Sequence, residues 1–151
     1  MEPITEADLP AVAAVMKRAF DDDAQRHLGI AEQGPPGYDD GGFFRKWLFG
    51  HEESDGAKVM VGGEVAGAFI VWPFRDSVLG TIFVDPALQR RGLGGAVWRH
   101  IEQSHPSRSW TLETPVWALS NHSFYEGCGF ERVEVKGDSV VYRKETGRID
   151  R

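Results

Sequence analysis

Cysteine is almost absent from this sequence, because Cys128 is the only one among 151 residues. One thiol cannot form a disulfide within the chain, which excludes a disulfide-stabilised scaffold and argues against dithiol redox chemistry. Long apolar segments are missing as well: no run of eighteen apolar residues is present, so no membrane-spanning helix is expected. The N-terminal segment MEPITEADLP has neither the basic nor the apolar region of a signal peptide, and we therefore expect a cytoplasmic protein.

Basic residues are also in deficit, with 17 Lys and Arg against 23 Asp and Glu and a formal net charge of -6. Because binding to a phosphate backbone needs a basic face, this balance argues against a nucleic-acid-binding protein. The five histidines show no H-E-x-x-H spacing and no paired cysteines accompany them, so no metal site is expected. No Gly-Lys-Ser or Gly-Lys-Thr occurs, which disfavours a nucleotide triphosphatase of the Walker type.

What is present fits a single domain over residues 1–151, with 41% hydrophobic and 26% charged residues. Apolar residues at helical spacing predict a helix that starts after Thr5 and runs through Phe20, and an acidic loop rich in glycine and proline over residues 21–40. Further helices are predicted over 43–49, from 93 to near Pro106, and from a cap at Ser120 or Asn121 to Gly127. Strands are predicted over 58–61, 65–72, 78–84, 110–113, 133–135 and 140–143, with a clipped strand over 1–4 and a final turn at Gly137-Asp138. This order indicates an α+β domain with a mixed sheet.

A glycine-rich segment, VDPALQRRGLGG, spans residues 84–95 between a predicted strand and a predicted helix. Several unpaired backbone N–H groups meet there at the positive end of a helix dipole, which attracts phosphate. Gly92 and Gly94 let an anion approach the backbone, and Arg90 and Arg91 add charge-assisted hydrogen bonds. A dinucleotide fingerprint would place its third glycine at Val97 and needs a βαβ unit that the preceding strands do not form, so that motif is disfavoured.

Two motifs resemble the GNAT family of N-acetyltransferases. The sequence V-D-P followed by Q-R-R-G-L-G resembles motif A of the family, [QR]-x-x-G-x-[GA] after a strand, and residues 124–130, F-Y-E-G-C-G-F, resemble its motif B. The resemblance extends over residues 5–143 and implies a mixed, mostly antiparallel sheet flanked by helices. It also implies acetyl-CoA as the acyl donor, with direct transfer to an amine and no acyl-enzyme.

The resemblance assigns roles to individual positions. Backbone N–H groups near the end of the strand before the loop polarise the thioester and hold the pantetheine arm, and the loop itself holds the pyrophosphate. Tyr125 matches the tyrosine that protonates the departing thiolate, and Glu113 matches a glutamate of the ribosomal-protein acetyltransferases, which makes it our candidate general base. The carboxylate position of the histone-acetylating branch is the apolar Val78, which excludes that arrangement. The coenzyme-binding residues implied in this way are Ile82, Phe83, Val84, Gln89, Arg90, Arg91, Gly92, Leu93, Gly94 and Gly95.

One position departs from the family pattern. Seven residues before Tyr125, where the family commonly has an asparagine that contacts the coenzyme, this sequence has Ala118. Asn121 lies three residues later and either caps the helix or replaces the missing contact. This departure keeps open an alternative function, a non-catalytic acetyl-CoA-binding sensor of the same fold.

Acidic residues are concentrated in the first third of the chain, at Asp21 to Asp23, Asp39 and Asp40. They indicate a cationic amine as acceptor, with Asp22, Asp23 and His27 as candidate substrate-binding residues, although a solvated acidic face explains the same residues equally well. We therefore expect an N-acetyltransferase that acts on a primary amine of a small molecule or of a protein or peptide. The acceptor, the acyl chain length and the assembly state, a homodimer among the options, are left open.

Overall fold

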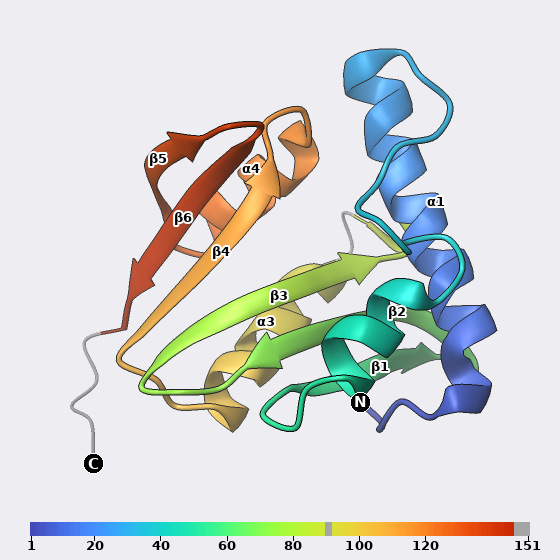
Figure 1. Ribbon diagram of the computed structural model, residues 1–151, viewed down its shortest axis with the longest axis horizontal. Coiled ribbons are helices and arrows are strands. Elements are labelled where there is room, and N and C mark those ends of the chain that lie inside the picture. Colours follow the sequence, from blue (N-terminus) through green and yellow to red (C-terminus); the bar gives the residue numbers. More distant parts are fainter. Residues whose placement is uncertain (90–91, 147–151) are drawn as a thin grey trace.

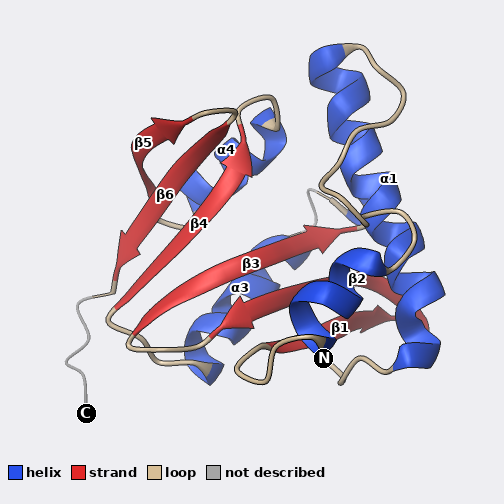
Figure 2. Cartoon of the chain, in the orientation of Figure 1, coloured by secondary structure: helices blue, strands red, loops and turns tan. Residues whose placement is uncertain are grey.

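The fold is built on a six-stranded mixed sheet in a computed structural model that describes residues 1–89 and 92–146 (Figures 1 and 2). The strands lie in the order β1-β2-β3-β4-β6-β5. Their bounds are β1 Asp55–Val61, β2 Glu64–Trp72, β3 Asp76–Val84, β4 Ser109–Pro115, β5 Glu131–Lys136 and β6 Ser139–Glu145. The helices are η1 Glu6–Asp8, α1 Leu9–Leu28, α2 Gly42–Phe44, η2 Arg45–Phe49, η3 Pro86–Leu88, α3 Leu93–Ser104 and α4 Leu119–Gly127. The predicted α+β fold with a mixed sheet is confirmed.

The sheet consists of two antiparallel parts, β1-β2-β3 and β4-β6-β5, joined by a parallel contact between β3 and β4. Parallel strands need a crossover connection, which α3 provides. The contact is short: only residues 76–78 of β3 pair with residues 109–111 of β4, and beyond them the two strands diverge (Figure 1). A register shift between β2 and β3 at Ile70/Val71 lies close to this point. The two halves of the sheet therefore separate toward the end of β3.

Polar contacts hold the closed end of this divergence together. The Arg108 guanidinium donates to the Asp76 carboxylate from Nε at 3.1 Å, and the Ser109 hydroxyl donates to it at 2.6 Å. These hydrogen bonds lower the pKa of Asp76 to about 2. The Ser77 and Ser107 hydroxyls, both buried, lie 2.6 Å apart. These contacts join β3 and β4 at the start of both strands. The strands separate beyond residue 78 of β3, where their backbone pairing ends.

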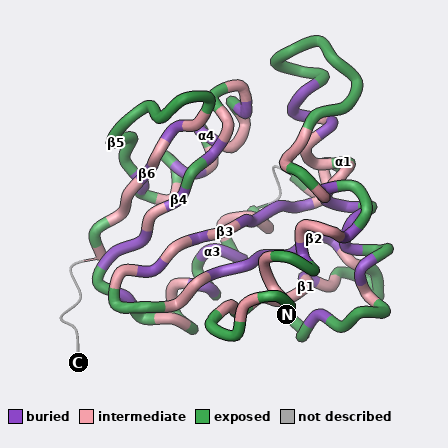
Figure 3. The backbone as a smooth tube through the Cα atoms, in the orientation of Figure 1, coloured by how far each residue is buried: buried purple, intermediate pink, exposed green. Residues whose placement is uncertain are grey.

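Two apolar cores lie on opposite faces of the sheet. Buried residues of α3 and α4, among them Val97, Ile101 and Tyr125, pack with Trp110 and Leu112 of β4 on one face. The other face of β2 and β3 is covered by α1 and α2, whose buried residues include Val12, Val15, Met16 and Phe44. Figure 3 shows this burial along the central strands, whereas the edge strand β5 is exposed throughout. The helices thus fix the open end of β3 between α1 on one side and α3 and α4 on the other.

Helix α1 is longer than the sequence predicted, since residues 21–28 are helical and do not form a loop. The acidic run does not break the helix because its carboxylates have partners one turn away: Asp21 pairs with Lys17, Asp22 pairs with Arg26, and Asp23 lies 3.2 Å from the His27 imidazole. The helix ends at Gly29, whose φ of 70° suits a left-handed C-cap. The three aspartates consequently project from a rigid helix.

The remaining elements follow the prediction with two exceptions. The predicted strands all lie within the observed ones, the helix over 43–49 is present as α2 and η2, and the last hairpin turns at Gly137 with a φ of 63°. The clipped strand over residues 1–4 is reduced to one bridge between Glu2 and Lys58. The capping prediction is wrong, because α4 starts at Leu119 after Ala118 and has no side-chain cap. Within the described ranges no helix has the length and apolar character needed to cross a bilayer.

Candidate active site

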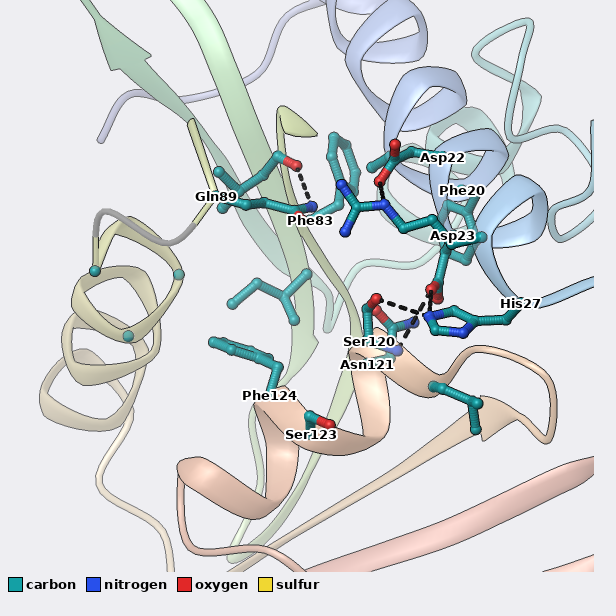
Figure 4. Close-up of a pocket in the computed structure, with 18 residues that line it drawn as sticks. Phe20, Asp22, Asp23, His27, Phe83, Gln89, Ser120, Asn121, Ser123 and Phe124 are labelled. Carbon is teal, nitrogen blue, oxygen red and sulfur yellow. Dashed lines mark hydrogen bonds and ion pairs between the residues drawn. The ribbon is translucent and has the colours of Figure 1, made fainter. Parts of the chain in front are cut away.

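A cavity of about 540 Å³ lies at the open end of β3. Its walls come from the last turns of α1, the end of β3 with the glycine loop, and the first turns of α4 (Figure 4). Eleven of the residues proposed from the sequence line it: Asp22, Asp23, His27, Ile82, Phe83, Val84, Gln89, Gly92, Gly94, Gly95 and Asn121. The fold thus brings the predicted coenzyme-binding and acceptor-binding residues together around one space.

The backbone of β3 presents unpaired groups to this space. The Asp85 N–H donates to the Ala66 carbonyl at 2.7 Å, which makes Asp85 a hydrogen-bonded position of the β2-β3 ladder. In an antiparallel ladder such positions alternate, so Val84 and Ile82 direct their N–H and C=O groups away from β2. The Gln89 side-chain amide donates to the Val84 carbonyl at 3.4 Å, in agreement with this direction. Since β4 has already diverged, the N–H groups of Ile82 and Val84 and the Ile82 carbonyl have no strand partner among the described residues and can bind a ligand.

The start of α3 offers a second set of backbone donors. Gly92 has a φ of 77° and turns the chain into α3, and no side chain caps that helix among the described residues. The N–H groups of Leu93, Gly94 and Gly95 lie in the first turn, where an α-helix has no internal acceptors for them. The Leu93 side chain itself packs against the core and does not line the cavity, so it can contribute only its backbone. Arg90 and Arg91, the cations predicted here, lie outside the described residues.

Tyr125 lies in the core directly after Phe124, which lines the cavity. Its side chain is 6% exposed and packs against Phe130 and Tyr142, with ring centroids 5.9 and 6.1 Å away. Burial raises the pKa of the Tyr125 phenol well above its usual value. Tyr125 does not line the cavity in this conformation, and its role as general acid stays a prediction.

Glu113 is not brought to the cavity. It lies on β4 between the buried Leu112 and Thr114, so its side chain projects from the opposite, exposed face of the strand. Its carboxylate lies 3.8 Å from the Lys136 ammonium, and the side chain is 55% exposed. The base role of Glu113 therefore also stays a prediction, and direct contact with a ligand in the cavity is not part of this conformation.

The first turns of α4 form the wall opposite α3. Ala118, at the family's asparagine position, is fully buried and cannot reach the cavity. Asn121 lines the cavity one turn later, and its amide donates to the Thr114 hydroxyl at 3.3 Å. This placement is compatible with the replacement role predicted for Asn121.

The aspartates of α1 have three different environments. Asp21 accepts from Lys17 at 2.6 Å, from the Tyr38 hydroxyl at 2.6 Å and from the Gln33 N–H at 3.2 Å. Although burial opposes it, hydrogen bonding to Lys17 and Tyr38 holds the pKa of Asp21 below its usual value. Asp21 therefore anchors the loop after α1. The next residue, Asp22, lines the cavity and is paired with Arg26 at 3.1 Å.

Asp23, the third aspartate of the run, is buried and lines the cavity. Its side chain is only 7% exposed, and its Oδ1 atom lies 3.2 Å from His27 Nε2 and 3.4 Å from the Ser120 N–H at the start of α4. His27 Nε2 also lies 3.3 Å from the Ser120 hydroxyl. The second carboxylate oxygen, Oδ2, is buried and has no hydrogen-bond partner among the described residues. Figure 4 shows Asp23, His27 and Ser120 converging between α1 and α4.

Seven residues that line the cavity were not proposed from the sequence: Ala19, Phe20, Arg26, Leu119, Ser120, Ser123 and Phe124. The helical spacing of Phe20, Asp23 and His27 would have placed them on one face had α1 been extended past Phe20. Phe124 stood inside motif B but was overlooked beside Tyr125. Ser120 was considered as a helix cap, whereas its N–H contacts Asp23.

Strand N–H groups and a helix start that face one cavity suit a ligand with an extended arm and a pyrophosphate, such as an acyl-carrying coenzyme. Residues 53–132, just over half of the chain, match the family model of the acetyltransferase (GNAT) domain. The chain belongs to this family and is an acetyl-CoA-dependent acyltransferase.

Solved structures share the fold at low sequence identity. The PaiA N-acetyltransferase of Thermoplasma acidophilum, in complex with coenzyme A, aligns with a TM-score of 0.77 and 12% identity over 95% of this chain and 96% of that one. An acetyltransferase from Thermus thermophilus aligns with a TM-score of 0.75 and 18% identity, over 95% of this chain and 94% of that one. A ribosomal-protein alanine N-acetyltransferase from Escherichia coli aligns with a TM-score of 0.71 and 18% identity, over 99% of this chain and 94% of that one. No curated protein matches the sequence.

Proposed function

We propose that this protein transfers an acetyl group from acetyl-CoA directly to a primary amine of a small molecule or of a peptide. The single observation that supports this most strongly is the divergence of β3 from β4, which leaves the N–H groups of Ile82 and Val84 without a strand partner among the described residues, on a strand end that lines the cavity. Acetyl-CoA supplies a thioester that an amine can attack.

The residues present fit such a donor. Free N–H and C=O groups of an edge strand bind an extended segment as a further strand would, so Ile82 and Val84 suit the amides of the pantetheine arm. The first-turn N–H groups of α3, with the helix dipole behind them, suit the pyrophosphate. Gln89 fixes the Val84 carbonyl and hence the end of β3. Asn121, on the α4 wall, is proposed as a further contact with the arm.

Transfer requires a new N–C bond, cleavage of the C–S bond, loss of a proton from the ammonium group, and a proton or hydrogen bond for the sulfur. A backbone N–H of β3 polarises the thioester carbonyl. Tyr125 is proposed to donate a hydrogen bond or proton to the sulfur, for which its phenol, with a pKa raised by burial, is in the protonated form at neutral pH. An alkylammonium with a pKa of about 10.4 must be deprotonated before attack. Glu113 is proposed as the base, acting through water because its carboxylate lies on the exposed face of β4.

The test is thiol release from acetyl-CoA in the presence of a panel of primary amines, with coenzyme binding measured separately by calorimetry. The expected result is amine-dependent thiol release together with a matching N-acetylated product. Tight coenzyme binding without thiol release from any amine class would contradict the proposal and favour the sensor function.

A further inference from the structure

We infer that Asp23 binds the amine nitrogen of the acceptor, and that the acceptor is a compact monoamine with an apolar body, not a polycation. This inference rests on the proposed function and names the substrate class of the same site. Its starting point is that Asp23 lines the cavity and that the second oxygen of its carboxylate is buried without a partner among the described residues.

A buried carboxylate oxygen without a partner is costly, because burial removes the water that would otherwise solvate it. The position of Asp23 is nevertheless firmly fixed, since its other oxygen is held between His27 and the Ser120 N–H at the start of α4. The carboxylate is thus held in place by one oxygen and left available by the other. A ligand N–H satisfies the remaining oxygen, from an ammonium group and, after loss of its proton, from the neutral amine.

The other acidic groups do not provide a second ammonium site. Asp21 is engaged with Lys17, Tyr38 and the Gln33 N–H, and does not line the cavity. Asp22 is paired with Arg26, so that pair carries no net charge toward a ligand. Asp40, which lies in the loop between α1 and α2, accepts a hydrogen bond from the Gly42 N–H at 2.8 Å. Of the two acidic residues that line the cavity within the described ranges, Asp22 is held in an ion pair and Asp23 has an oxygen without a partner.

The surroundings of Asp23 specify the rest of the acceptor. Phe20 and Ala19 of α1 and Leu119 of α4 line the same cavity and present apolar surface. Arg26 also lines the cavity, but because it is paired with Asp22, the pair leaves no uncompensated acidic group there for a second ammonium group. A single amine joined to an aromatic or aliphatic body fits these walls, whereas a polyamine would leave charges against apolar side chains.

The experiment compares Asp23→Asn with the control Glu32→Gln, a carboxylate-to-amide change at an exposed acid that does not line the cavity, using benzylamine and phenethylamine as monoamine probes and spermidine as the polyamine. The amide oxygen introduced by Asp23→Asn still accepts from the Ser120 N–H, so the fold is expected to persist, which circular dichroism checks. We expect KM for the monoamines to rise by about 10- to 100-fold in Asp23→Asn, the size of a lost charge-assisted hydrogen bond, with coenzyme affinity unchanged. Glu32→Gln should leave KM within about twofold, because Glu32 does not line the cavity and its exposed ion pair with Lys17 contributes little.

An unchanged monoamine KM in a folded Asp23→Asn, or a preference of the unaltered protein for spermidine over both monoamines, would overturn the inference. If Asp23→Asn does not fold, Asp23→Glu keeps the charge and displaces the oxygen, and should still raise KM. If the unaltered protein binds coenzyme A but releases no thiol, the proposed function fails. Benzylamine binding to the coenzyme A complex, measured by NMR on the unaltered protein and Asp23→Asn, then tests Asp23 independently: equal binding overturns its role, and weaker binding to the variant supports it.

Discussion

Gly94 and Phe124 are in direct contact across the mouth of the cavity: a Cβ added to Gly94 would lie 2.8 Å from Cε1 of the Phe124 ring. The glycine therefore allows the start of α3 and the middle of α4 to approach each other. The neighbouring Gly95 differs, since a Cβ there would meet only the Arg99 guanidinium at 3.4 Å. A side chain at position 94 would therefore collide with Phe124, whereas a methyl group at position 95 has room.

The first prediction concerns these two glycines. Gly94→Ala forces the Phe124 ring to shift and displaces the first turn of α3, so we expect coenzyme A affinity to fall by about tenfold, equivalent to about 1.4 kcal/mol. Gly95→Ala should change it much less. Isothermal titration of both variants with coenzyme A measures the difference. Equal affinities in the two variants would show that the Gly94–Phe124 contact does not shape the site.

The second prediction concerns Tyr125 and Tyr142, whose rings lie 6.1 Å apart. Tyr125→Phe keeps the ring contacts and removes the hydroxyl, so kcat should fall by about 10² to 10⁴ while coenzyme affinity and stability are retained. In the control Tyr142→Phe, the lost hydroxyl is bonded to Glu126 at 2.7 Å and lies 2.9 Å from His122 Nδ1. That variant should lose stability but keep most of its kcat. Full turnover by Tyr125→Phe would exclude Tyr125 as the general acid.

The third prediction is a pH dependence of stability at the closed end of β3 and β4. Hydrogen bonds from Arg108 and Ser109 lower the pKa of Asp76 to about 2 in the folded state, below the value of about 3.9 for an unfolded aspartate. A lowered folded-state pKa stabilises the fold above the unfolded value, so this contribution is present above about pH 4 and is lost between about pH 4 and pH 2. Urea unfolding of Asp76→Asn should show a deficit at pH 7 that disappears near pH 2. A deficit that is independent of pH would indicate that the charge on Asp76 is not involved.

The fourth prediction tests the structural role of Asp21. Burial and the hydrogen bond to Asp21 raise the pKa of Tyr38 to about 12, so Tyr38 remains a donor to the carboxylate throughout the neutral range. Tyr38→Phe removes this 2.6 Å bond and should lower the free energy of unfolding by about 1 to 3 kcal/mol. The amine KM should stay nearly constant, because neither residue lines the cavity. A large rise in KM with unchanged stability would instead place Asp21 in acceptor binding.

Much of the fold could be predicted because its periodicities are local. The strand pattern of β2 and β3 and the glycine loop before α3 were readable from residues close in sequence, as was the turn at Gly137. The end of α1 was not, because its extension depends on ion pairs such as Asp22–Arg26 and on the cap at Gly29, which outweigh the loop tendency of an acidic run. The capping prediction for α4 was wrong because Ala118 is the N-cap residue and the first-turn N–H of Ser120 is bonded by Asp23 of the distant helix α1.

The site was predictable in composition but not in arrangement. Motif spacing identified most of the residues that line the cavity, since glycines and strand ends are recognisable from sequence alone. Which aspartate faces the cavity could not be predicted, because it depends on contacts from distant segments: Tyr38 and Gln33 engage Asp21, whereas Ser120, 97 residues away from Asp23, engages only one of its oxygens. The exposed position of Glu113 likewise follows from the pleat of β4 relative to the core, which motif matching does not specify.

The most direct test of the central claim uses acetyl-CoA with an isotopically labelled acetyl group and a primary amine, with products followed by mass spectrometry. The account predicts labelled N-acetylamine and free coenzyme A in equal amounts, with no label on the protein when the amine is left out. Label retained on the protein, for example at Cys128, or coenzyme binding with no labelled amine product, would contradict direct transfer to an amine.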